Sequence, residues 1–77
     1  MPTTVGKYNS MEKEVREFGK RIKEIRLKKN LSQGDVARIL GVHRTYISGL
    51  ERGARTPSLS TIHKVAKALG VSVKEVV

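Results

Sequence analysis

The chain has no cysteine and no tryptophan, and its only aromatic residues are two tyrosines and one phenylalanine. Without thiols it can form neither a disulfide framework nor a thiolate site. So few aromatic side chains argue against binding of single-stranded RNA, because such surfaces stack bases on aromatic rings. No apolar run approaches the roughly 20 residues of a membrane span, and MPTTVGKYNS lacks the basic and apolar blocks of a signal peptide. We therefore expect a cytoplasmic protein that does not insert into a membrane.

Acidic residues are also scarce: seven Asp and Glu stand against sixteen Lys and Arg, which gives a net charge of +9. A small domain with this balance attracts polyanions, although charge alone does not choose among DNA, RNA and anionic membranes. A chain of 77 residues forms one domain and buries only about 60% of its unfolded surface. An enclosed active site has no room in such a domain, so we expect a binding protein and not an enzyme.

Helical periodicity begins at Glu12. Before it, residues 1–11 are polar and aperiodic, and we interpret them as a flexible N-terminal tail, with contact to DNA left open. In the folded domain, residues 12–77, the first apolar stripe has spacings of 3, 4 and 3, which is one face of a helix: Val15, Phe18, Ile22 and Ile25. Asn30 is a candidate stop for this helix.

Capping signals divide the remainder of the chain into four further helices. Ser32 with Asp35 opens the second helix as a capping box, and Gly41 ends it. The third helix begins near His43 and stops at Gly53. The other boundary residues are Ser58 and Gly70 around a fourth helix, and Ser72 with Glu75 at the start of a fifth. The sequence therefore predicts an all-α fold of five helices with short loops.

The second and third predicted helices have the features of a helix-turn-helix unit, in which two short helices are joined by a glycine turn. Ala37 is small where the helices would cross, and Gly41 permits a positive φ in the turn. Three apolar side chains are then expected to point into the domain: Val42, Ile47 and Leu50. The third helix offers few other core anchors, because its remaining side chains are mostly hydrogen-bonding groups.

The stretch LSQGDVARILGVHRTYISGLERGARTPSLSTIHKVAKALGVSVKEV resembles the phage-repressor and Cro-type (XRE-like) helix-turn-helix family. RTYISGLERG followed by a basic loop looks most like the controller proteins of restriction–modification systems. The resemblance implies a compact, lambda-repressor-like DNA-binding domain, a homodimer, and regulation of transcription through a palindromic operator in double-stranded DNA. It also implies that the first turn of the third helix enters the major groove, where base edges present distinct donors and acceptors.

Five residues of this unit are candidate DNA contacts. Arg44 occupies the first exposed position of the third helix, where an arginine can pair with O6 and N7 of guanine. Thr45 can reach a base edge or the methyl group of thymine, and Ser48 lies one turn farther along. Gln33, at the start of the second helix, suits a backbone phosphate, and in the family this glutamine touches the operator. Tyr46 either hydrogen-bonds DNA or packs against the fourth helix.

The turn after the third helix carries two more candidate contacts, Arg52 and Arg55, of which Arg55 matches a loop arginine that reaches DNA in controller proteins. Glu51 would be repelled by phosphate, and the family often pairs it with an arginine late in the first helix, here Arg26; we expect a structural salt bridge. Apolar residues near the end of the chain exceed the needs of the core and are predicted to form the dimer interface: Leu69, Val71, Val73, Val76 and Val77.

The sequence does not indicate a site for a metal, a cofactor or a small molecule. His43 and His63 have no cysteine and no clustered acids around them, so we expect no metal, no cofactor and no small-molecule ligand. A different class of function stays open, because an antitoxin or adaptor uses the same fold mainly to bind protein. The operator sequence and the direction of regulation are left open as well.

Overall fold

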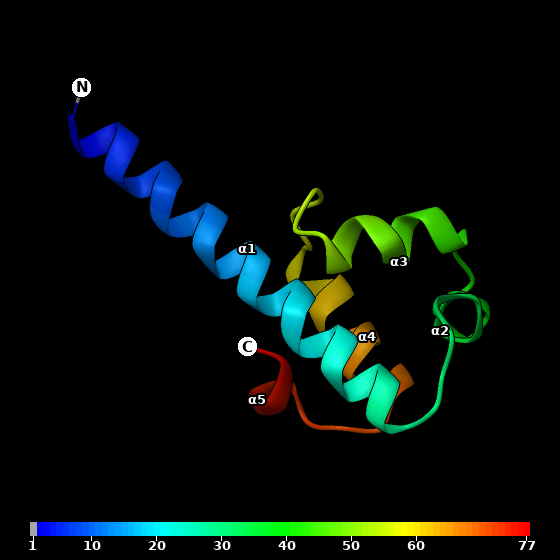
Figure 1. Ribbon diagram of the computed structural model, residues 1–77. Coiled ribbons are helices and arrows are strands. Elements are labelled where there is room, and N and C mark those ends of the chain that lie inside the picture. The colour runs from blue at the N-terminus through cyan, green and yellow to red at the C-terminus, as the bar shows by residue number, and fades with distance from the viewer. Residues whose placement is uncertain (1) are drawn as a thin grey trace.

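The computed structural model describes the backbone of residues 2–77 and the side chains from residue 12 onward, and this part contains five helices and no strand. The helices are α1 (Pro2–Lys28), α2 (Gln33–Leu40), α3 (Arg44–Glu51), α4 (Leu59–Leu69) and α5 (Val73–Val76). The long α1 packs against α3, α4 and α5, and α2 packs against α3 and α4. Figure 1 shows α3 and α5 on opposite sides of α1, and the N-terminal half of α1 extending away from the other helices.

The core is built from one apolar stripe of each helix. Phe18 and Ile22 of α1 are buried as their spacing predicts, and Ile47 and Leu50 of α3 are 1% and 0% exposed. The other buried apolar residues are Val36, Ala37, Val65, Ala66, Leu69 and Val76. Between Phe18 and Ile22, Gly19 lets α1 approach the end of α3: a Cβ built there would lie 2.2 Å from the Leu50 carbonyl oxygen.

The predicted caps determine where the helices begin and end. The Asp35 N–H donates to Ser32 Oγ at 2.9 Å, and the Ser32 N–H donates to the Asp35 carboxylate at 2.8 Å, so the capping box of α2 is complete. Hydrogen bonding of the Asp35 carboxylate to the backbone N–H and the side chain of Ser32, reinforced by Arg38, lowers the pKa of Asp35. Asn30, at φ 59°, ends the turn after α1 in the left-handed region, as expected for a stop residue.

Two sequence predictions, one about a helix boundary and one about the core, differ from the structure. The helix begins at Pro2 and not at Glu12, and proline is well suited to a first helical position because its missing N–H would have no partner there. The side chains of residues 2–11 lie outside the described residues, so the mobility expected of that segment stays a prediction. Val42 is 38% exposed; it belongs to the turn and does not fill the core as predicted.

The predicted dimer interface also needs correction. Leu69 and Val76 are 2% and 0% exposed and form part of the core cluster, so neither side chain can reach a second subunit. Val71 and Val73 are half-buried against that cluster, and Val77 is 59% exposed. The sequence count of apolar residues did not anticipate that the short α5 closes the core with Val76. Among the described residues, no helix has the length and the apolar character that crossing a membrane requires.

Candidate nucleic-acid interface

The turn between α2 and α3 sets the direction of α3. Gly41 has φ 73°, and its N–H caps α2 by donating to carbonyls of the preceding turn. The Val42 N–H follows with a bond to the Ala37 carbonyl at 3.0 Å. His43 then caps α3, because its Nδ1 accepts from the Thr45 N–H at 3.1 Å. The first turn of α3 is therefore held by a side-chain cap that the sequence analysis did not assign to His43.

The two faces of α3 differ sharply in polarity. Ile47 and Leu50 on the inner face are buried. Arg44 and Thr45 are exposed on the outer face, and Ser48 lies half-buried beside them. We call Arg44, Thr45 and Ser48 the recognition strip. It places guanidinium and hydroxyl groups on the surface, anchored by apolar side chains on the opposite side of the same helix.

A buried ion pair fixes the far end of α3 to α1. Arg26 Nε lies 2.6 Å from Glu51 Oε2, and Arg26 Nη2 donates to Glu51 Oε1 at 3.0 Å. The two side chains are only 9% and 3% exposed. Arg26 Nη1 also donates to the Leu31 carbonyl at 2.8 Å, so the guanidinium holds the connection from α1 to α2 as well. The hydrogen bond with Glu51 raises the pKa of Arg26 against the opposing effect of its burial. The predicted Arg26–Glu51 salt bridge is present.

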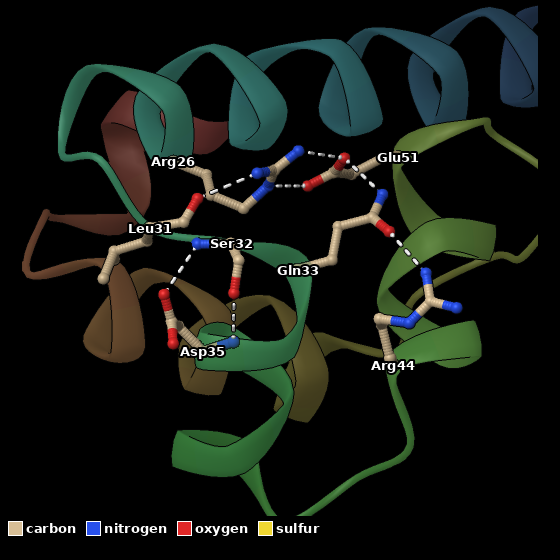
Figure 2. A network of polar contacts seen from close by, with 7 residues as sticks. All are labelled: Arg26, Leu31, Ser32, Gln33, Asp35, Arg44 and Glu51. Atoms are coloured by element: carbon tan, nitrogen blue, oxygen red, sulfur yellow. Dashed lines mark hydrogen bonds and ion pairs between the residues drawn. The ribbon is translucent and has the colours of Figure 1, made fainter.

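The ion pair continues into a hydrogen-bonded chain that ends on the recognition strip (Figure 2). Gln33 Nε2 donates to Glu51 Oε1 at 3.0 Å, and Arg44 Nη1 approaches Gln33 Oε1 at 3.5 Å. Since Glu51 accepts only, the Gln33 amide must direct its NH₂ group toward Glu51 and its oxygen toward Arg44. One amide hydrogen expected to meet a phosphate is thus engaged inside the protein. Contact between Gln33 and DNA stays a prediction.

The surroundings of Tyr46 favour the packing alternative in the free protein. Its hydroxyl lies 3.4 Å from Thr61 Oγ1 of α4, and its ring packs against the core cluster. The Arg55 guanidinium carbon lies 5.3 Å from the centroid of the Tyr46 ring. Arg52 is exposed, and its Nε donates to Ser48 Oγ at 3.4 Å. The sequence did not identify Thr61 as the partner of the Tyr46 hydroxyl. Its position in the first turn of α4 was the only indication that it could be one.

The seven candidate contacts therefore divide into a group of four, a stacked pair, and Gln33 by itself. Arg44, Thr45 and Ser48 lie on the outer side of α3, and Arg52, the C-cap residue of that helix, bonds to Ser48. Gln33 is half-buried and meets Arg44. Tyr46 and Arg55 form a separate stacked pair. In the portion of the chain that the structure describes, no three His, Asp or Glu side chains are grouped as metal ligands would be. The arrangement offers hydrogen-bond donors and positive charge, which are the groups that DNA contacts require.

Comparison with known proteins identifies a family and several relatives of this chain. The profile of the HTH_3 helix-turn-helix family matches residues 22–76. Control protein C.BamHI of Bacillus amyloliquefaciens is 51% identical over 59 residues, which cover 75% of this chain and 73% of that protein. The immunity repressor of Bacillus phage phi105 is 42% identical over 59 residues, but these span 77% of this chain and only 41% of the repressor.

Solved structures of controller proteins are also similar to this chain. The restriction–modification controller protein C.AhdI from Aeromonas hydrophila superposes with a TM-score of 0.78 at 41% identity, covering 82% of this chain and 96% of that one. The controller protein C.Esp1396I, solved as a tetramer with its natural 35 base-pair operator, matches with a TM-score of 0.73 at 34% identity, covering 82% of this chain and 93% of that one. Both solved structures belong to controller proteins, and their alignments include most of this chain.

Proposed function

We propose that this chain, which belongs to the HTH_3 helix-turn-helix family, is a sequence-specific regulator of transcription that binds double-stranded DNA as a homodimer. The observation that carries the proposal is the recognition strip, in which Arg44 and Thr45 are exposed and Ser48 is half-buried. It lies on a helix whose opposite side is anchored in the core by Ile47 and Leu50. A helix held this way presents its first turn to the major groove, where Arg44 can pair with guanine and Thr45 with a neighbouring base.

Affinity and specificity come from different groups in this proposal. Much of the affinity follows from neutralising phosphates, to which the net charge of +9 contributes. The logarithm of the binding constant should therefore fall linearly with the logarithm of salt concentration, with a slope of about −0.9 for each phosphate contacted. Specificity follows from base contacts of the recognition strip, so its loss should equalise the affinities of different sequences.

The finer assignment is a controller protein of a restriction–modification system. Support comes from the identities with C.BamHI and C.AhdI and from the length of the alignments. We assign no reaction to the protein and infer that it works in the cytoplasm, where it meets its DNA. A neighbouring endonuclease gene and methyltransferase gene would support the controller assignment, whereas their absence would leave a regulator of another kind.

The geometry of DNA reading supports the homodimer of this proposal. One recognition helix reads only a few base pairs, so two helices about one DNA turn apart give a palindromic site of useful length. The revised interface uses apolar groups that remain accessible: Val71, Val73 and Val77 from the original set, together with Leu59, which is 77% exposed in the first turn of α4. Val77 also lines a groove with Val15, Pro57 and Ile62. A second copy seated there would cover this apolar surface.

Two experiments test the proposal. Duplexes recovered from a random library by the protein should share one sequence with two-fold symmetry, and DNA upstream of the protein's own gene should contain it. Sedimentation at micromolar concentration should show a dimer that Leu59→Asp or Val77→Asp dissociates. Recovery of unrelated sequences with equal affinity would refute sequence-specific binding and favour an antitoxin or adaptor, and a monomer at all concentrations would refute the homodimer.

A further inference from the structure

Arg55 lies in the loop after α3, yet its side chain is directed back along that helix. A Cβ built on Gly49 would lie 3.1 Å from Arg55 Cγ, 3.5 Å from Cδ and 3.6 Å from Nε. The aliphatic part of Arg55 therefore passes directly over Gly49, at a distance that a side chain there would obstruct. Gly49 has no positive φ, so backbone conformation gives no reason for glycine at this position.

The head group of Arg55 ends over Tyr46. Its guanidinium carbon lies 5.3 Å from the ring centroid, within the range of a cation–π interaction. The ring is itself held, because the Tyr46 hydroxyl lies 3.4 Å from Thr61 Oγ1, which lies 3.0 Å from Ser58 Oγ. The ring also packs against the core. Tyr46 thus presents a fixed aromatic face to a cation that would otherwise move freely in a loop.

Helix geometry places this cation beside the recognition strip. At 3.6 residues per turn, successive side chains are about 100° apart, so Gly49 lies only about 40° around the helix from Thr45. Arg44 forms the opposite edge of the strip, where its Nη1 lies 3.5 Å from Gln33 Oε1. The exposed side of α3 is thus flanked by two arginines, each held by a neighbouring side chain before any DNA is present.

We propose that Gly49 and Tyr46 form a track on α3 that holds Arg55 ready for DNA, which makes both of them positioning residues for that arginine. Arg55 then binds an acceptor of the duplex, a phosphate oxygen or a base edge, without first losing the freedom of a loop side chain. The inference rests on the proposed function and deepens it. It assigns Tyr46 to Arg55 instead of to a contact of its own, and gives Gly49 a role in binding.

The free protein allows a test that needs no DNA. Protons on Cγ and Cδ of Arg55 should show upfield ring-current shifts in the NMR spectrum, and Tyr46→Leu should abolish them. Tyr46→Phe should keep them, because the ring remains. Gly49→Leu should reduce them by displacing the arginine while preserving the helical circular dichroism. Random-coil shifts for Arg55 in the unsubstituted protein would overturn the track.

The effect on binding is tested with a duplex selected by the unsubstituted protein from a random library. Arg55→Ala should weaken binding about 10- to 100-fold, as expected for a contact to a charged donor. Tyr46→Leu should weaken it about two- to fivefold, the size of an exposed cation–π contribution. Gly49→Leu should weaken it by no more than Arg55→Ala does. Uniform weakening on all duplexes identifies a phosphate contact, and loss of preference at one base pair identifies a base contact.

Double substitutions separate this inference from the proposed function. If Gly49 and Tyr46 act through Arg55, then Gly49→Leu and Tyr46→Leu should add almost nothing to binding in an Arg55→Ala background. Full additivity would overturn the inference while leaving sequence-specific binding intact. If Gly49→Leu does not fold, Gly49→Ala, which requires Arg55 to move by a few tenths of an ångström, gives a smaller effect in the same cycle. Failure of the unsubstituted protein to select any sequence would instead refute the proposed function.

Discussion

Replacing Arg26 by alanine should be among the most destabilising single changes in the described part of the chain. The substitution removes both bonds to Glu51 and the bond to the Leu31 carbonyl. It leaves the Glu51 carboxylate, 3% exposed, with a hydrogen bond from Gln33 at 3.0 Å but without its counter-charge. An uncompensated buried charge is costly because the interior solvates it poorly.

The expected loss of stability follows from the burial of the Glu51 carboxylate. Breaking a buried ion pair by removing one partner costs about 3–5 kcal/mol, and the remaining bond from Gln33 places Arg26→Ala near the lower end. A domain of 77 residues has a total unfolding free energy of about 4–12 kcal/mol. The variant should therefore lose a quarter or more of its stability. With a urea m-value of about 1–3 kcal/mol per molar, the midpoint should fall by at least about 1 M.

Urea unfolding followed by circular dichroism is the suitable assay, because the chain is helical and has no tryptophan. Arg38→Ala is the matched control: it breaks the ion pair with Asp35, but the Arg38 side chain is 76% exposed, so the loss should stay below about 1 kcal/mol. Arg26→Met with Glu51→Met should be less destabilising than Arg26→Met alone, since no charge is left buried. Equal losses for Arg26→Ala and Arg38→Ala would refute the reasoning.

Two further substitutions test the packing and the capping. Gly19→Ala should lower the free energy of unfolding, measured with urea, by more than about 2 kcal/mol despite the better helix propensity of alanine. The reason is that its Cβ would lie 2.2 Å from the Leu50 carbonyl oxygen. Gly34→Ala is the control and should be neutral or stabilising, because its Cβ would lie 3.6 Å from Ser32 Oγ. Hydrogen bonds from Ser32 lower the pKa of Asp35 in the folded protein. Its carboxylate therefore stabilises the fold fully when the pH is above the pKa of Asp in the unfolded chain, about 3.9. This stabilisation is lost progressively as the pH falls through the lower pKa of the folded protein. Asp35→Asn should therefore be less stable than the unsubstituted protein near pH 6, and the difference in urea midpoint should shrink below about pH 4; a constant difference would contradict this capping role.

Local sequence signals predicted most of the fold. Ser32, Gly41, Ser58 and Gly70 mark helix ends at the residues where the structure has them, because caps act within one turn and need no knowledge of distant packing. The salt bridge of Arg26 could be predicted only through resemblance, since its partner lies 25 residues away in the sequence.

What the sequence could not reveal depends on contacts between distant segments. Gly19 looks like an unfavourable residue in a helix until α3 is seen to press its backbone against it. Val76 looks like surplus apolar area until α5 is placed over the core. The candidate interface follows the same rule: Arg44 could be assigned from its position in α3, whereas the orientation of Gln33 and the docking of Arg55 required coordinates.

The most direct test of the account is the ratio of affinities for a selected operator and a scrambled duplex of the same composition, measured by gel shift at one salt concentration. Arg44→Ala should reduce this ratio about 5- to 150-fold, the value of a bidentate base contact. Lys74→Ala, on α5 and away from α3 in Figure 1, removes the same charge and should leave the ratio unchanged. If Arg44→Ala lowers both affinities equally and keeps the ratio, the first turn of α3 does not read the bases, and the central claim is wrong.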